Sequence, residues 1–183
     1  MKISSKLTIG EFAALIASKL RERGIEAALS GGAVVSIYTD NRYQSFDADF
    51  ISPDDNKKIE AAMTDLGFKK KGKDFSHPDT DFFVEFPTGP LSVGRKIIKP
   101  ENEITIKGNS LRLLSPTQAV MDRLCAFFFW NDRQGLDQAI WIARAQPIKI
   151  SIIKKWAKEE GETEKFEEFL SELKSGGINE PSA

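Results

Sequence analysis

The chain has 183 residues, a net charge of −1 and a single cysteine, so it is long enough for one domain, or one domain with a helical extension, around a substantial core. This balance of charge predicts no strong overall attraction to nucleic acid, and any such binding would have to come from local patches. The lone Cys125 excludes an internal disulfide, and no apolar run is long enough to span a membrane or to act as a signal segment. We therefore expect a soluble cytoplasmic protein without a membrane partner.

The first predicted element is a helix with a capping box at its start. Thr8 and Glu11 have the spacing at which each side chain can bond the backbone N–H of the other residue. Apolar residues at helical spacing follow as far as Gly24. This pattern predicts an amphipathic helix that covers a sheet.

A glycine pair, Gly31 and Gly32, separates two apolar segments over residues 25–29 and 33–38. The pattern predicts a strand, a tight turn and a short buried helix. Glycines at such a junction let the backbone approach a ligand closely, and the N–H groups at the start of the helix favour phosphate. Most glycine pairs, however, simply form a turn.

Two aspartates lie one residue apart in the next apolar segment, residues 46–51. The alternation of side chains along a strand places Asp47 and Asp49 on one face. Two like charges so close repel each other unless they are solvated or bind a cation, and an oxygen ligand set with open positions suits Mg²⁺. The simpler alternative is a solvent-facing strand end.

A helix and a lysine-rich hairpin are predicted next. Pro53 lies near the expected first turn of the helix, which runs to about Leu66. Residues 68–75 contain four lysines and lead to a turn over residues 76–80. The lysines are either a solvated surface or an electrostatic contact for an acidic acceptor such as tRNA, and the second function would make binding fall steeply with salt.

A third carboxylate, Glu85, interrupts another apolar segment with strand propensity, residues 81–87. Three carboxylates on adjacent strands beside a glycine turn could hold one or two divalent ions against a triphosphate. The pattern therefore indicates a metal and phosphate site rather than three unrelated surface charges.

The remaining chain predicts a hairpin from residues 104–106 and 111–113, followed by helices from residue 115 onward. The aromatic run 127–130 is expected in the core, with the edge of Trp130 as a stacking surface for a base. The predicted fold class is α/β or α+β, with a small mixed sheet and flanking helices followed by a helical bundle. We expect the core to comprise residues 1–114, the helical region residues 115–175 and a flexible tail residues 176–183.

Taken in order, these motifs resemble the nucleotidyltransferase superfamily of the DNA polymerase beta-like fold. The resemblance spans roughly residues 25–145, and its motifs are residues 30–32, 42–49, 84–94, 122–124 and 130–134. More narrowly, the chain resembles small prokaryotic members, some of which are toxins or are associated with toxins. The spacer from Gly32 to Asp47 is slightly longer than is usual in the family, a departure that concerns the geometry of the loop and not the carboxylates.

The resemblance implies metal-dependent transfer of a nucleoside monophosphate from an NTP to an acceptor. Mg²⁺ or Mn²⁺ would be bound by the catalytic carboxylates of Asp47, Asp49 and Glu85. The acceptor would be tRNA or a protein hydroxyl, and a cognate toxin or antitoxin protein would be a partner. The nucleotide would contact Gly31, Gly32, Ser45, Arg123 and Arg133.

Three other interpretations fit the same residues. A structural ion-pair network would explain the charged residues near 122 and 133 as well as nucleotide contacts do. A non-catalytic nucleotide-binding or partner-binding module would retain the same fold, although unpaired carboxylates on strands are costly without a cation. An unrelated α/β domain with accidental acids is the third alternative.

Overall fold

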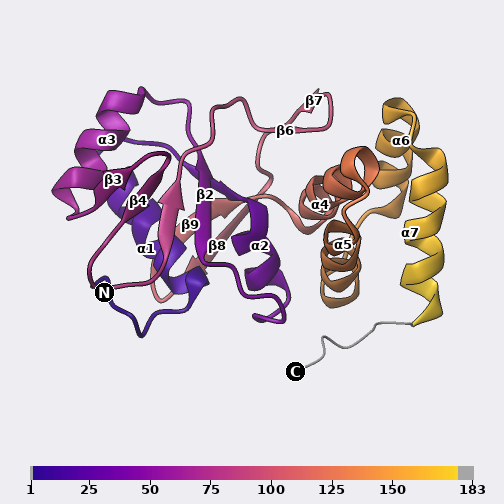
Figure 1. Ribbon diagram of the computed structural model, residues 1–183, viewed down its shortest axis with the longest axis horizontal. Helices are drawn as coiled ribbons and strands as arrows, with labels where there is room; N and C mark the ends of the chain where they lie inside the picture. Colours follow the sequence, from indigo (N-terminus) through magenta and orange to yellow (C-terminus); the bar gives the residue numbers. More distant parts are fainter. Residues whose placement is uncertain (1, 177–183) are drawn as a thin grey trace. The chain divides into compact units, whose positions relative to one another are not determined.

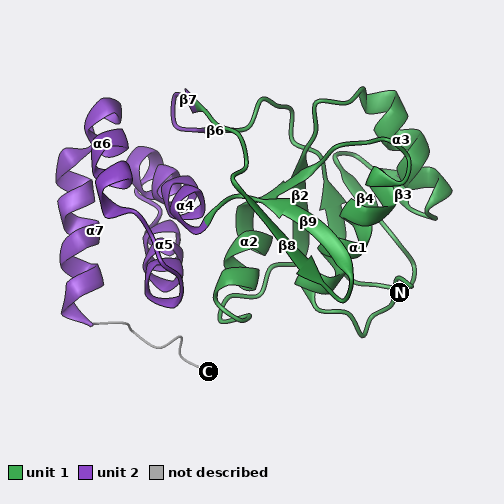
Figure 2. Cartoon of the chain, turned by 180° about the vertical axis from the view of Figure 1, so that it is seen from behind, with its two compact units in different colours: residues 1–92, 97–115 green, residues 93–96, 116–183 purple. Residues whose placement is uncertain are grey.

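The computed structural model describes residues 2–176 and divides the chain into two compact units (Figures 1 and 2). Unit 1 contains the residues up to 92 together with residues 97–115. Unit 2 contains residues 93–96 and the chain from residue 116 onward. Residues 177–183, which make up most of the predicted tail, lie outside the described residues. The predicted fold class is confirmed: the described chain combines helices with a mixed sheet in an α+β arrangement.

The sheet of unit 1 has the strand order β3-β4-β5-β2-β1-β9-β8. The pairs β1–β9 and β2–β5 are parallel, and the other neighbouring strands are antiparallel. The predicted hairpin near residue 108 is confirmed as β8 and β9. The strands are β1 (Ala28–Ser30), β2 (Asp47–Ile51), β3 (Lys69–Lys71), β4 (Asp74–Ser76), β5 (Phe83–Glu85), β8 (Asn102–Ile106) and β9 (Asn109–Leu113).

Three helices belong to unit 1: α1 (Ile9–Arg21), α2 (Gly31–Tyr38) and α3 (Asn56–Asp65). The predicted capping box of α1 is confirmed, since the Thr8 N–H donates to Glu11 at 2.9 Å and the Glu11 N–H donates to the Thr8 hydroxyl at 3.2 Å. The expectation for Pro53 is wrong. Asp55 is the N-cap of α3, and its side chain accepts from two N–H groups of the first turn, so the helix begins after the proline.

The two faces of the sheet differ in burial around β2. Ala48 and Phe50 on β2, Val84 on β5 and Phe75 on β4 are buried on one face. Side chains alternate along a strand and residues in register share a face, so the intervening residues lie on the opposite face. We call this second face the carboxylate face. It carries Asp47, Asp49, Phe83, Glu85, Asp74, Ser76, Lys69 and Lys71.

Unit 2 is a group of helices, α4 (Pro116–Trp130), α5 (Arg133–Ala145), α6 (Ile150–Glu160) and α7 (Thr163–Ser175), and they lie side by side in Figure 1. Residues 93–96 form most of a hairpin of β6 (Ser92–Val93) and β7 (Lys96–Ile97), and they group with these helices. The Gly94 N–H donates to the Cys125 thiol at 3.0 Å, and the Trp156 indole N–H donates to the Val93 carbonyl at 3.3 Å. These contacts join the hairpin to the helical unit.

The expectation that residues 127–130 are all core residues is half wrong. Phe127 and Phe128 are buried, whereas Phe129 is 42% exposed and Trp130, the last residue of α4, is 76% exposed. A helix turns by about 100° per residue, so four consecutive side chains cannot all face one core. Among the described residues, no helix combines the length and apolar character that a membrane span requires.

Candidate active site

The start of α2 and the middle of β2 meet at one close contact. Gly31 has φ of +68°, and a Cβ built on it would lie 2.2 Å from Oδ2 of Asp49. Ser30, immediately before Gly31, is in register with Asp49 across the β1–β2 pair. The Asp49 carboxylate is therefore seated directly against the glycine backbone, and both the positive φ and the missing side chain are needed there.

The helix start also has the features of an anion site. Within the described residues, the N-cap Ser30 makes no side-chain capping bond, although its hydroxyl donates to the Asp49 carbonyl at 3.3 Å. The N–H groups of the first helical turn have no intrahelical acceptor, and the helix dipole adds positive potential at the same point. This part of the predicted phosphate site has the expected local structure.

Ser45 lies beside the second glycine. A Cβ on Gly32 would lie 3.0 Å from the Ser45 hydroxyl. That hydroxyl donates to the Asp47 carbonyl at 3.0 Å and accepts from the Asp47 N–H at 3.3 Å, while the Ser45 N–H donates to the Ser36 hydroxyl at 3.0 Å. In this structure the Ser45 side chain thus orders the backbone of the first aspartate, and a nucleotide contact by Ser45 stays a prediction.

The three predicted carboxylates share the carboxylate face. Asp49 is in register with Glu85 on the neighbouring parallel strand β5, and Asp47 precedes Asp49 by two residues. Asp47 is exposed, whereas Asp49 and Glu85 are partly buried. The strand pairing therefore brings together residues that are 36 positions apart in the chain.

Glu85 has two neighbours that no local sequence pattern indicates. The Lys73 ammonium lies 2.9 Å from the Glu85 carboxylate, and Asp74 is in register with Glu85 on the antiparallel strand β4. Burial and the Asp74 carboxyl raise the pKa of Glu85 above its ordinary value, while Lys73 acts in the opposite direction. The Glu85 carboxylate in turn raises the pKa of Lys73. The alternation of side chains along β4 could have identified Asp74 as a neighbour of Glu85 only if the pairing of β4 with β5 had been known.

The donor set around β2 fits a divalent cation in part. Among residues 2–176, no group of three or more His, Cys, Asp or Glu side chains is placed to hold a metal ion. Asp47 and Asp49 nevertheless suit Mg²⁺, which commonly takes one or two carboxylates together with water and substrate phosphates. Glu85 is ion-paired with Lys73, so the three predicted ligands are not preassembled, and their role as ligands stays a prediction.

Arg123 and Arg133 belong to unit 2 and have acidic partners there. The Arg123 guanidinium lies 2.6 Å from the carboxylate of the preceding residue, Asp122. Arg133 is ion-paired with Glu168 and Glu172 on α7, and these hydrogen bonds raise the pKa of Arg133. These contacts favour the ion-pair network that the sequence left open as an alternative to nucleotide contacts.

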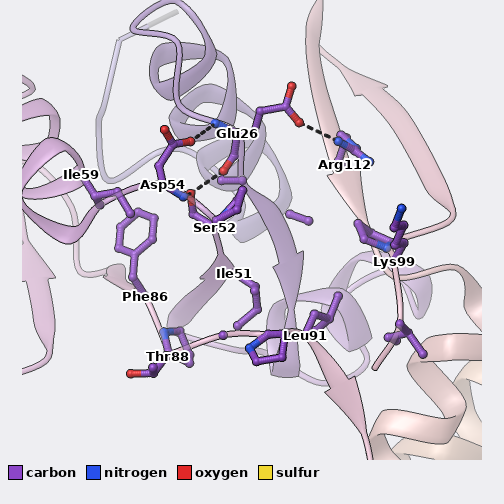
Figure 3. A pocket seen from close by; sticks show the side chains of 18 of the residues that line it. Glu26, Ile51, Ser52, Asp54, Ile59, Phe86, Thr88, Leu91, Lys99 and Arg112 are labelled. Carbon is purple, nitrogen blue, oxygen red and sulfur yellow. Dashed lines mark hydrogen bonds and ion pairs between the residues drawn. The ribbon is translucent and has the colours of Figure 1, made fainter. Parts of the chain in front are cut away.

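A pocket of about 650 Å³ lies in unit 1 at the other end of β1 and β2 from the glycine turn (Figure 3). One of its wall residues, Ile51, follows Asp49 by two positions and so shares the carboxylate face. Two acids at the pocket are already paired. The Glu26 carboxylate lies 2.8 Å from the Arg112 guanidinium. The Asp54 carboxylate lies 2.6 Å from the Lys58 ammonium and accepts a hydrogen bond from the Glu26 N–H. The sequence gives no local signal for this pocket, because its lining comes from segments distant in the chain.

The remaining walls of the pocket are largely apolar and come from α3, from the loop that follows β5 and from the residues after β7. They are formed in part by Ile59, Phe86, Pro87, Pro90, Leu91 and Ile98. The lining also includes the cations Lys99 and Arg112, the second of which is paired with Glu26.

The fold just described is that of nucleotidyltransferase-like proteins. The chain is similar to an antigenic nucleotidyltransferase-like protein from Paracoccidioides brasiliensis, with 16% identity, a TM-score of 0.56, and coverage of 77% of this chain and 78% of that one. It is also similar to the antibiotic-resistance factor ANT(2'')-Ia, with 14% identity, a TM-score of 0.51, and coverage of 92% and 95%. No family model and no curated protein matches the chain.

At these identities the similarity concerns the fold alone. The resemblance found in the sequence is thus confirmed for the nucleotidyltransferase fold. The narrower resemblance to toxin-associated members, the metal and the substrates stay predictions.

Proposed function

We propose that this protein is a metal-dependent nucleotidyltransferase that moves a nucleoside monophosphate from an NTP to an acceptor hydroxyl. The observation that carries the proposal is the Asp49 carboxylate, which is seated against Gly31 at the start of α2 and in register with Glu85. A carboxylate pair beside the start of a helix would bring cation ligands and phosphate-binding N–H groups together, and nucleotidyl transfer requires both.

In this proposal, the backbone N–H groups at Gly31 and Gly32 bind the β and γ phosphates, because the first N–H groups of a helix have no intrahelical acceptor. Asp47 and Asp49 would hold Mg²⁺ or Mn²⁺, with Glu85 as a further ligand. When bound, such an ion neutralises phosphate charge and lowers the pKa of the attacking hydroxyl. The protein itself contributes positioning and an ordered set of charges.

The transfer step forms one bond and breaks one. The acceptor oxygen bonds to the α phosphorus as the bond from that phosphorus to the bridging oxygen breaks, and pyrophosphate leaves with the electron pair. The hydroxyl proton passes to the Glu85 carboxylate and from there to water. Lys73 must first release Glu85, and its side chain, 77% exposed, can turn toward solvent.

The proposal is tested with purified protein, each α-labelled NTP in turn, Mg²⁺ or Mn²⁺, and total cellular RNA or lysate. We expect label on an acceptor with the wild type, and a loss of at least about 10²-fold with Asp47→Asn. Asp79→Asn removes an exposed acid elsewhere in unit 1 and serves as the matched control. Asp47→Asn protein that stays folded and transfers label at the wild-type rate would refute the assignment.

The Lys73–Glu85 ion pair favours a second candidate, a nucleotide-binding or partner-binding module without catalysis, because a cation of the protein already neutralises one of the three carboxylates. NTP binding that depends on metal, with no label on RNA or protein under either ion, would support this candidate. Lys73→Gln protein that gains transfer activity would instead show that the ion pair restrains an enzyme.

The acceptor in the proposed reaction is tRNA or a protein hydroxyl, and a cognate toxin or antitoxin protein is the proposed partner. Separation of the labelled products by nuclease and protease digestion distinguishes the two acceptors. Co-purification of the tagged protein with a stoichiometric protein partner would support the proposed toxin or antitoxin partner, and purification of the chain alone would count against that partner.

A further inference from the structure

The edge strand β3 presents alternate lysines to opposite faces of the sheet. Lys70 is in register with the buried Phe75, lies over the Phe75 ring at 5.7 Å from Nζ to the centroid, and is ion-paired with Glu60 of α3 at 2.8 Å. Lys69 and Lys71 are in register with Ser76 and Asp74, so they share the carboxylate face. Both are exposed, and within the described residues neither has an ion-pair partner.

Two rows of side chains connect these lysines to the proposed catalytic carboxylates. One row runs from Lys69 across β4 and β5 to Asp47. The other runs from Lys71 across the same strands to Asp49. With neighbouring strands about 4.8 Å apart, three steps place the lysines roughly 14 Å from the aspartates. A few nucleotides of an extended strand could cover that distance.

An exposed aromatic side chain lies within the first row. Phe83 is in register with Asp47 on β5, and 39% of its surface is exposed. A phenylalanine on an open sheet face beside a carboxylate contributes little to a core, but it offers a flat surface for a base. Cations that contact phosphates, combined with an aromatic ring on which bases stack, are the recurring elements of single-strand nucleic-acid binding.

We infer that the acceptor of the proposed nucleotidyltransferase is a single-stranded nucleic acid that lies across the carboxylate face. Its phosphates contact Lys69 and Lys71, and a base near its 3′ end stacks on Phe83, which brings the terminal hydroxyl to Asp47 and Glu85. This inference rests on the proposed function. The net charge of −1 gives no overall attraction to nucleic acid, so the binding depends on the two lysines at one edge of the sheet.

The binding test uses fluorescence anisotropy with labelled single-stranded RNA and DNA of the same sequence, with EDTA and without NTP. Lys69→Gln/Lys71→Gln removes two charges from the carboxylate face, and Lys57→Gln/Lys70→Gln removes two charges from outside it. We expect the first pair to lose at least about tenfold in affinity at low salt. The slope of log K against log salt should fall by about 1.4, or about 0.7 for each of two phosphate contacts. The control pair should change affinity by less than about twofold.

Phe83→Leu tests the stacking surface separately. This variant should lose about tenfold in affinity for both strands while the slope against salt stays that of the wild type, because stacking carries no charge. Equal binding of RNA and DNA would indicate contacts to phosphates and bases alone, whereas tighter RNA binding would add contacts to the 2′ hydroxyl.

The outcomes separate this inference from the proposed function. Two results would overturn the inference and leave nucleotidyl transfer standing. One is an equal loss of affinity in the two double variants. The other is wild-type protein that binds neither strand but transfers label to protein. Binding that requires Lys69 and Lys71, with label on protein but not on the bound strand, would overturn the role as acceptor and leave the proposed reaction standing. No label on either the strand or protein would overturn both. Asp47→Asn should keep the binding and lose the transfer.

Discussion

The contact between Gly31 and Asp49 predicts that Gly31→Ala damages the site more than the fold. The new Cβ would lie 2.2 Å from Oδ2 of Asp49, whereas ordinary van der Waals contact begins near 3.4 Å. The carboxylate must therefore move by about 1.2 Å, the difference between those two distances. Because Oδ2 belongs to a side chain and not to the backbone, the side chain can rotate away, and this rotation displaces a proposed cation ligand.

Two magnitudes follow from this geometry. The left-handed backbone conformation of Gly31 adds roughly 1–2 kcal/mol of strain when a side chain is present. Displacement of a functional group by about 1 Å lowers turnover by about 10²-fold. Gly24→Ala is a matched control. Gly24 has a φ of +69°, so a side chain there adds the same strain, but the new Cβ would meet no atom of the described residues within 4 Å, its chain neighbours apart.

Urea unfolding and transfer of label from an NTP measure the two effects. We expect both variants to lose roughly 1–2 kcal/mol of unfolding free energy. Only Gly31→Ala should also lose about 10²-fold in transfer rate, at a temperature where both variants are folded. Equal transfer rates for the two variants would refute the reasoning, because they would mean that the position of Asp49 does not matter for the reaction.

Three further results are expected. The backbone N–H of Thr8, the N-cap of α1, holds the pKa of Glu11 below its ordinary 4.5. Glu11→Gln should therefore lower the unfolding free energy by less than about 1 kcal/mol at pH 7, and this difference should vanish as the pH falls through the lowered pKa. A difference independent of pH would contradict the capping box. Burial raises the pKa of Cys125 to about 12, so a disulfide reagent at pH 8 should modify the native thiol far more slowly than the urea-unfolded thiol, and equal rates would show that the thiol is accessible. Arg133→Gln breaks the ion pairs with Glu168 and Glu172. It should change the unfolding free energy by less than about 1 kcal/mol and leave the affinity for NTP unchanged. A tenfold loss of NTP affinity would instead support the nucleotide contact that the sequence predicted for Arg133.

Local patterns in the sequence predicted the elements of the candidate site. The glycine pair predicted the strand, turn and helix around Gly31, although α2 begins at Gly31 itself and β1 is shifted to Ala28–Ser30. Alternation predicted that Asp47 and Asp49 share a face, and the order of strands β2 and β5 in the sheet supports the neighbouring position of Glu85. Such features depend on residues within a few positions of each other, so the chain specifies them locally.

The tertiary structure decided which of these elements meet. The register of β4 and β5 places Asp74 opposite Glu85, and the same hairpin brings Lys73 to Glu85. The pairing of β3 likewise decides that Lys69 and not Lys70 shares the face of Asp47. Strand register and pairing arise from contacts between segments far apart in the chain. Periodicity can therefore predict that alternate side chains share a face, but only the folded sheet determines which residues of other strands lie beside them.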